Sequence, residues 1–144
     1  MIKPWFCEIV RGKGAFALLA LRLVAGPAFI LHGSGKIMHA FAWMGPSSPV
    51  PAWLQGLAAF AEFGGGIAIL IGFLTPIAAM GIACNMLVAM FMVHIPHGDP
   101  FVSKVGGHSW EPAADYLAIM IVFILRGAGS ISLDALVFGK MKKS

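Results

Sequence analysis

Ionisable side chains interrupt the apolar segments of this sequence, where a charge is stable only if it is paired or performs a function. Residues 21–36, LRLVAGPAFILHGSGK, carry Arg22, His32 and Lys36. On an α-helix with about 100° per residue, Lys36 lies about 40° from Arg22 and His32 lies about 80° from it. Because a charge that faces lipid is costly, this side of the helix is expected to face protein.

Glu62 lies near the middle of the next apolar segment, and an ionised carboxylate at that depth needs a partner. Arg22 is the basic residue whose position and reach suit it best, so we predict an ion pair between Glu62 and Arg22. Such a pair has two interpretations: it fixes the register of two helices, or it belongs to a functional site. Asn85 adds a third polar side chain at mid-depth, in the third apolar segment.

A second group of polar residues is predicted at the outer end of the helices. Asp115 and Arg126 are almost three helical turns apart and therefore share one face of the fourth segment, with Asp115 at the outer end. The spacing His94-x-x-His97 is a weak metal motif, because Pro96 breaks the helix that would align the two rings. Hydrated loop histidines are the alternative, and no metal or haem site is argued. The outer group comprises His32, Lys36, His94, His97, Asp115 and Tyr116.

The composition explains why these polar groups stand out. Of the 144 residues, 59% are hydrophobic and only 11% are charged, too few charges to cover the surface of a soluble domain. The net charge of +4 comes with no motif that reads nucleic acid, and most basic residues lie at the two chain ends. The sequence therefore predicts a lipid bilayer as its surroundings and no nucleic acid as a partner.

Four apolar segments each have about the 20 residues that a helix needs to cross a membrane. The chain ends hold six Lys or Arg residues, and the two long loops hold few, so the positive-inside rule predicts both termini in the cytoplasm. We therefore expect an all-α membrane protein, a four-transmembrane-helix bundle that forms a single domain over residues 1–144. Gly64, Ala68 and Gly72 form a small-xxx-small row that suits a close helix contact or a homo-oligomer. The predicted spans are residues 15–35, 52–74, 76–95 and 113–133.

Several sequence patterns, taken together and in order, give the chain a resemblance to the DoxX family of small four-span membrane proteins. They are LRLVAGPAFILHGSGKI, AEFGGGIAILIGFLTPIAA, NMLVAMFMVHIPHG and ADYLAIMIVFILRGAGSISLDAL. Asp115 stands where Glu would be more usual in the family. The residues that match the family pattern are Arg22, Gly33, Lys36, Glu62, Gly65, Gly66 and Asp115.

The resemblance implies a protein of a bacterial or archaeal cytoplasmic (inner) membrane that is linked to quinones. Related proteins include the membrane subunit of thiosulfate:quinone oxidoreductase, and others are linked to thiol stress. A quinone head group needs hydrogen-bond donors and a proton path, so Glu62 and Asp115 are assigned to proton relay. Residues assigned to quinone binding are Arg22, His32, Lys36, His94 and Tyr116.

Three functions remain open at this point. The first is a quinone-interacting subunit of an oxidoreductase in sulfur or thiol metabolism. This chain has no redox-cofactor motif, so an extracytoplasmic redox partner subunit would supply the other half of the chemistry. The second is a non-catalytic membrane scaffold or assembly factor, whose polar groups would all be paired inside the bundle. The third is a small proton-coupled transporter that acts as an oligomer, with a polar path from Asp115 through Glu62 to Arg22.

Overall fold

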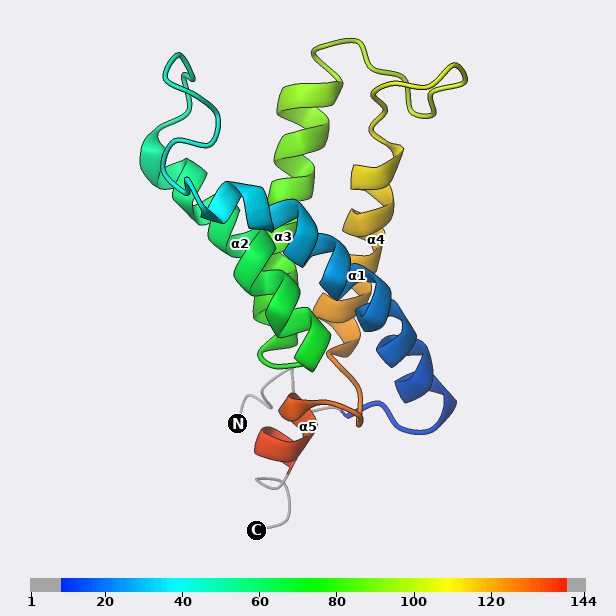
Figure 1. Ribbon diagram of the computed structural model, residues 1–144. Helices are drawn as coiled ribbons and strands as arrows, with labels where there is room; N and C mark the ends of the chain where they lie inside the picture. Colours follow the sequence, from blue (N-terminus) through cyan, green and yellow to red (C-terminus); the bar gives the residue numbers. More distant parts are fainter. Residues whose placement is uncertain (1–8, 140–144) are drawn as a thin grey trace, which may run out of the picture.

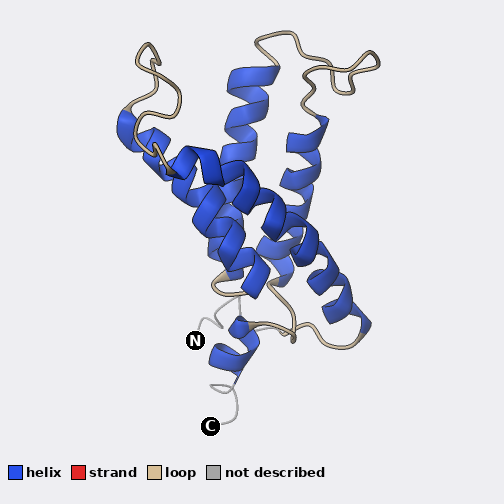
Figure 2. Cartoon of the chain, viewed as in Figure 1, coloured by secondary structure: helices blue, strands red, loops and turns tan. Residues whose placement is uncertain are grey.

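The computed structural model describes residues 9–139, and the secondary structure within this range is helical throughout (Figure 2). Of the described helices, α1, α2 and the continuous α3–η2 unit are long and apolar enough to cross a membrane. The elements in chain order are α1 (Lys13–Ile37), α2 (Ala52–Ile71), α3 (Thr75–Val88), the π-helical segment η2 (Ala89–His94), α4 (Glu111–Arg126) and α5 (Leu133–Phe138).

The helices form two antiparallel pairs, α1 with α2 and α3 with α4, and α2 joins the pairs by packing on α3. Figure 1 shows the α1–α2 pair lying obliquely across the α3–α4 pair, with the short α5 below the bundle. One end of the bundle therefore contains the α2–α3 turn, the end of α4 and α5, and is called the Arg22 end here. The other contains the end of α1, the start of α2, His94 and the start of α4, and is called the Lys36 end.

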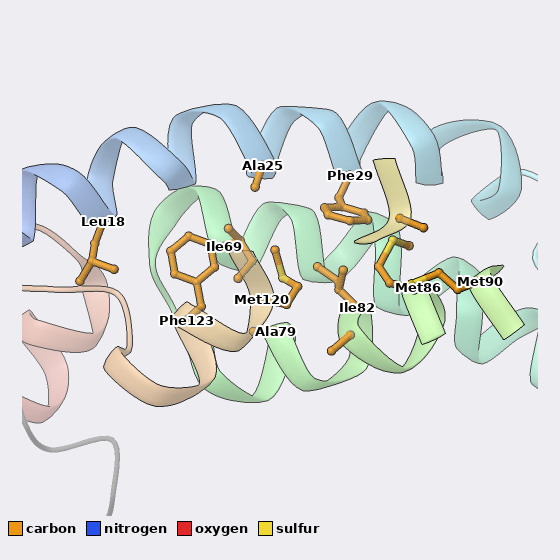
Figure 3. Packing of buried hydrophobic residues seen from close by; sticks show 12 residues of the cluster. Leu18, Ala25, Phe29, Ile69, Ala79, Ile82, Met86, Met90, Met120 and Phe123 are labelled. Carbon is orange, nitrogen blue, oxygen red and sulfur yellow. The ribbon is translucent and has the colours of Figure 1, made fainter. Parts of the chain in front are cut away.

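The core between the two pairs is built from apolar side chains of all four long helices. Figure 3 shows Phe29 of α1, Ile69 of α2, Ile82 of α3 and Phe123 of α4 directed into the same space. These side chains are almost completely buried. Large apolar side chains also cover the outside of the helices, as expected for a surface in contact with lipid.

Close packing of α1 on α2 depends on glycines of both helices. A Cβ atom at Gly33 would lie 2.5 Å from the backbone nitrogen of Phe63, and one at Gly66 would lie 2.7 Å from that of Ile30. A Cβ atom at Gly26 would lie 2.7 Å from Cβ of Leu70. The backbones thus approach as closely as glycine permits.

The predicted small-xxx-small row does not form this helix contact. Gly64 is exposed, with nothing within 4 Å of an added Cβ atom, and Gly72 lies beyond the end of α2 in the turn. The prediction that the row packs a helix within this chain is therefore wrong, and a role between chains stays a prediction.

The predicted spans 52–74 and 76–95 leave only Thr75 between them, which predicts a tight turn, and the structure confirms this turn between α2 and α3. Gly72 adopts the left-handed conformation with φ 69°, which glycine takes without a steric penalty and which ends α2 three residues before the predicted boundary. Leu74 follows with φ 48°, and Pro76 lies in the first turn of α3.

The predicted fourth span, residues 113–133, is wrong at its C-terminal end. Helix α4 ends at Arg126, because Gly127 (φ 67°) and Gly129 (φ 80°) have backbone conformations that a right-handed helix does not contain. The 16 residues of α4 have a length of about 24 Å. The chain then crosses the Arg22 end as a loop before α5 begins at Leu133.

Candidate functional site

Glu62 is paired with Lys36, and the predicted Glu62–Arg22 pair is wrong. The Lys36 Nζ atom lies 2.7 Å from Oε1 and 2.6 Å from Oε2 of Glu62, so the ammonium group contacts both carboxylate oxygens. The Glu62 side chain is 6% exposed and the Lys36 side chain is 28% exposed. The carboxylate is therefore buried, and its cation reaches it from the edge of the bundle.

The register between α1 and α2 explains the change of partner. Gly33 lies against Phe63, and Gly26 lies against Leu70, so the two helices advance equally in opposite directions. On this register Glu62 is level with the last turns of α1. Arg22 is level with the α2–α3 turn, about 18 Å farther along the helix axis at 1.5 Å per residue. That distance exceeds the reach of an arginine side chain.

Arg22 instead binds backbone carbonyl groups from two other parts of the chain. Its Nε donates to the carbonyl of Ile69 at 2.8 Å, and Nη2 donates to that of Leu70 at 2.7 Å. Its Nη1 donates to the carbonyls of Ala128 at 3.3 Å and Ile131 at 2.5 Å. The guanidinium group thus ties α1 to the C-terminal end of α2 and to the loop after α4. The C-terminal end of a helix carries a partial negative charge, which favours a cation at this position.

This arrangement removes Arg22 from the group of residues available to a ligand. The side chain is only 3% exposed, and all three of its nitrogen atoms donate hydrogen bonds to the protein. Its expected position on the protein-facing side of α1 is confirmed. Its role in the structure is that of a clamp, built from the planar set of donors that distinguishes arginine from lysine.

Trp43 and Gln55 complete the surroundings of Lys36, and neither residue was predicted from the sequence to belong to the site. The Lys36 Nζ atom lies 4.6 Å from the centre of the Trp43 ring, a cation–π contact. The Trp43 Nε1 atom donates to the carbonyl of Gln55 at 3.0 Å. The buried Gln55 amide accepts from the Met44 nitrogen and donates to the Val50 carbonyl. One side chain of α2 thereby holds the loop between α1 and α2 in place over Lys36.

His32 of α1 and Tyr116 of α4 meet beside the buried ring of Phe29. The His32 and Tyr116 ring centroids are 6.4 Å apart at an interplanar angle of 80°, and Tyr116 contacts Phe29 edge to face at 4.8 Å. His32 is exposed, and neither the His32 nor the Tyr116 side chain makes a hydrogen bond to another described residue. Two polar groups of the predicted outer group are thus brought together with their donors free on the surface.

Asp115 precedes Tyr116 and is also exposed, without a hydrogen bond or ion pair to the part of the chain that the structure describes. Arg126, predicted to share its face of the fourth helix, is exposed at the opposite end of α4. Asp115 is therefore at the Lys36 end, as expected, and its carboxylate is open to an external partner.

The remaining predicted polar residues lie apart from this surface. The His94 Nδ1 atom lies 2.7 Å from Oδ2 of Asp99, and the His97 Nδ1 atom lies 2.7 Å from the carbonyl of Val93. No hydrogen bond, ion pair or ring contact within residues 9–139 joins His94 to His32, Tyr116 or Lys36.

Asn85 likewise has a structural partner. Its Nδ2 atom donates to the carbonyl of Ala58 at 3.0 Å, which links α3 to α2. Across residues 9–139, no three His, Cys, Asp or Glu side chains are grouped closely enough to bind a metal ion.

The fold and the buried ion pair define a small helical membrane protein, and comparison with known proteins places it in a family. The model of the DoxX family matches residues 17–95, more than half of the chain. An uncharacterized protein of Haemophilus influenzae is 30% identical over 127 residues, which are 87% of this chain and 93% of that protein. No solved structure matches the chain. The chain belongs to the DoxX family.

The family match covers one part of the candidate site and not the other. It covers most of α1 and all of α2, α3 and η2, and therefore contains His32, Lys36 and Glu62. Tyr116 and Asp115, on α4, lie beyond it. The contact between His32 and Tyr116 thus joins the family-matched part of the chain to the part outside the match.

Proposed function

We propose that this DoxX-family membrane protein is a quinone-interacting subunit of an oxidoreductase and binds the quinone head group at the His32–Tyr116 surface. One observation carries the proposal: the His32 imidazole and the Tyr116 phenol meet between α1 and α4, and no described residue accepts a hydrogen bond from either side chain. An unsatisfied donor at such a position is favourable only when a ligand or water accepts its hydrogen bond.

The residues around this surface suit a flat apolar ring that carries carbonyl groups. The Phe29 ring forms an apolar floor against which Tyr116 is packed. The phenol hydroxyl and an imidazole N–H donate to carbonyl oxygens, and the aromatic rings offer flat contact area. A bound quinone would supply two-electron redox chemistry, and the protein would position it and move protons.

Asp115 is the proton acceptor that we assign to this site. It is adjacent to Tyr116 in sequence and has no partner within the described range, so its carboxylate can exchange protons with the outer aqueous phase. The Lys36–Glu62 pair lies one turn of α1 beyond His32. We assign Glu62 a relay role through Lys36, and Lys36 also supplies positive charge near the quinone oxygens.

The membrane arrangement follows from the same proposal. We place α4 as a fourth crossing, shorter than the other three, with the Arg22 end in the cytoplasm as the positive-inside rule predicts. The membrane is then the inner membrane of a bacterium or archaeon. The Lys36 end faces the outer compartment, where an extracytoplasmic partner would deliver electrons from a sulfur or thiol compound.

A non-catalytic scaffold is the second candidate, and one observation favours it. The buried charges of Arg22 and Glu62 are fully satisfied by this chain, which is the pattern of groups that stabilise a bundle. A proton-coupled carrier, active as an oligomer, has less support. Its path from Glu62 to Arg22 would have to cross about 18 Å along the helix axis.

Quinone retained through purification tests the proposal. The protein is purified in mild detergent, and extracted quinone is measured per chain by mass spectrometry and ultraviolet absorption. His32→Phe and Tyr116→Phe each keep an aromatic ring at the position and remove its polar atoms. His97→Ala is the matched control away from the site. We expect near-stoichiometric quinone in the parent and control proteins and at least a fivefold loss in the two site variants.

The opposite result is equally informative. Absence of quinone from the parent protein after purification in native lipid, or equal retention by both site variants, contradicts the proposal and favours the scaffold. Thermal unfolding of each variant accompanies the extraction, because a loss of quinone has this meaning only when the midpoint temperature is unchanged.

A further inference from the structure

Helix α5 presents two different faces at the Arg22 end of the bundle. At about 100° per residue, Leu133, Leu136 and Val137 fall within an arc of about 100°, and Asp134 and Phe138 fall on the other side. The side chains of the first group are 38%, 64% and 50% exposed. A helix of six residues therefore carries three uncovered apolar side chains in a row on one face.

The other face of α5 is firmly attached to the α2–α3 turn. Asp134 accepts hydrogen bonds from the backbone nitrogen atoms of Leu74 at 2.7 Å and Thr75 at 3.0 Å, and its own backbone nitrogen donates to the Gly72 carbonyl at 2.8 Å. Phe138 and Asp134 line a small cavity of about 30 Å³ with Leu74 and its neighbours. The direction of the uncovered face is thereby fixed relative to the bundle.

Exposed basic residues lie at the same end of the bundle as α5, and further basic residues follow α5 in the sequence. Arg11, Lys13 and Arg126 are exposed, and in sequence Lys140, Lys142 and Lys143 follow α5 directly. A backbone hydrogen bond of 2.8 Å from Ser130 to Val10 holds the segment that carries Arg11 against the loop before α5.

The acidic residue of the described chain at this end is already engaged. Both carboxylate oxygens of Asp134 accept hydrogen bonds from backbone nitrogen atoms at the α2–α3 turn. The exposed charged residues described at this end are therefore basic, and they are electrostatically complementary to anionic phosphate groups.

We propose that α5 is an interfacial anchor that binds the anionic lipid surface of the leaflet at the Arg22 end. Leu133, Leu136 and Val137 enter the boundary between head groups and acyl chains, and the neighbouring lysines and arginines contact lipid phosphates. Apolar insertion and electrostatic attraction are each weak for so short a helix, and stable attachment requires both. If α5 bound a protein instead, its attachment would not depend on the charge of the lipid.

Because Asp134 and Arg22 connect α5 and its preceding loop to α1, α2 and α3, the anchor also braces the bundle. Ala128 and Ile131, which accept hydrogen bonds from Arg22, lie in that loop. Lipid attachment of α5 would then hold this loop in the position that Arg22 requires. The inference is independent of quinone binding, which is assigned to the opposite end.

Fluorescence quenching from within the bilayer tests the anchor in the full chain. A single cysteine is placed at Val137 in a Cys7→Ser, Cys84→Ser background and labelled with the fluorophore NBD. The labelled protein is reconstituted into nanodiscs of phosphatidylglycerol or of phosphatidylcholine, each with lipids that carry a nitroxide on the acyl chain. A label at Leu31, exposed on α1 within the membrane-spanning region, gives the reference for full quenching.

In phosphatidylglycerol we expect the label at position 137 to reach at least half of the quenching at position 31. We expect at least a twofold decrease in phosphatidylcholine. The same decrease is expected in phosphatidylglycerol when Lys140, Lys142 and Lys143 are replaced by Gln, because each basic residue strengthens binding to an anionic surface about fivefold. Lys104→Gln, at the Lys36 end, is the control variant and leaves the quenching unchanged.

Two results overturn the anchor. The first is a label at position 137 that aqueous iodide quenches and lipid nitroxides do not, which would place α5 in water or against a protein. The second is quenching that is equal in both lipids and insensitive to the three lysine replacements. Helical content and elution from size-exclusion chromatography confirm that each labelled protein is folded.

Discussion

The two ends of the bundle bury charge in opposite ways. At the Arg22 end, one guanidinium group is bonded to carbonyl groups of two chain segments, and no acidic side chain of residues 9–139 is bonded to it. At the Lys36 end, a buried carboxylate is paired with a lysine that remains partly exposed. The first arrangement holds backbone segments in fixed positions. The second can change, because the lysine is partly exposed and can turn towards water or a ligand, although the Glu62 carboxylate then loses its partner.

Replacement of Arg22 is expected to have the largest effect on stability. Arg22→Met removes the donors to the carbonyl groups of Leu70 and Ala128 and should lower the free energy of unfolding by about 4 kcal/mol. Arg22→Lys should recover part of this, because an ammonium group has donors but not the planar span of a guanidinium group. Thermal unfolding followed by circular dichroism in detergent measures both. Equal stability of the parent and both variants would show that the hydrogen bonds of Arg22 do not stabilise the bundle.

The Lys36–Glu62 pair should respond unequally to loss of its two members. Lys36→Met leaves a buried carboxylate unpaired and should cost about 3 kcal/mol. Glu62→Gln leaves a lysine that can reach water and should cost about 1 kcal/mol. A double-mutant cycle of Lys36 with Glu62 should show strong coupling, and a cycle of Arg22 with Glu62 should show none. Coupling in the second cycle alone would restore the pair that the sequence predicted.

Loss of the Asp134 carboxylate should have a smaller effect than either. Asp134→Ala removes two hydrogen bonds to the start of α3 and should cost about 1 kcal/mol. The Leu74 and Thr75 amides should then exchange hydrogen faster than in the parent protein, measured by mass spectrometry. Unchanged exchange at these two amides would show that α5 does not brace the turn.

The sequence predicted the burial of Arg22 and Glu62 correctly, was wrong to place the exposed His32 on the protein-facing side of its helix, and failed on the partners of the buried groups. Arg22 faces protein and Glu62 is buried, as the helical periodicity indicates. Their pairing depends on the register of α1 against α2, and 14 residues of loop separate those helices. A loop of that length does not fix the register of the two helices. The depth of Arg22 and Glu62 in the bundle could therefore be judged only from their positions within the apolar segments. The glycines that fix the register, Gly26, Gly33 and Gly66, were visible but could not be matched to one another.

Other features depended on local signals of different strength. The α2–α3 turn was predictable because Pro76 marks a helix start and the intervening segment is too short for alternatives. The end of α4 was predictable in principle, because Arg126 followed by Gly127 is a common helix terminus. The predicted span was extended to residue 133 because the segment remains largely apolar beyond Arg126. The meeting of His32 and Tyr116 requires α1 to pack against α4. Those helices are far apart in sequence, and no local pattern reports that contact.

The most direct test of the central claim, that the Lys36 end binds a ligand and the Arg22 end maintains the fold, is one titration on three proteins. A short-chain quinone is titrated into His32→Phe, Tyr116→Phe and Arg22→Lys, and binding and thermal midpoint are measured on each. The account predicts at least a fivefold weaker affinity for the first two, with stability within about 0.5 kcal/mol of the parent. It predicts parental affinity and a lowered midpoint for Arg22→Lys. Parental affinity in the first two with lost binding in the third would contradict it.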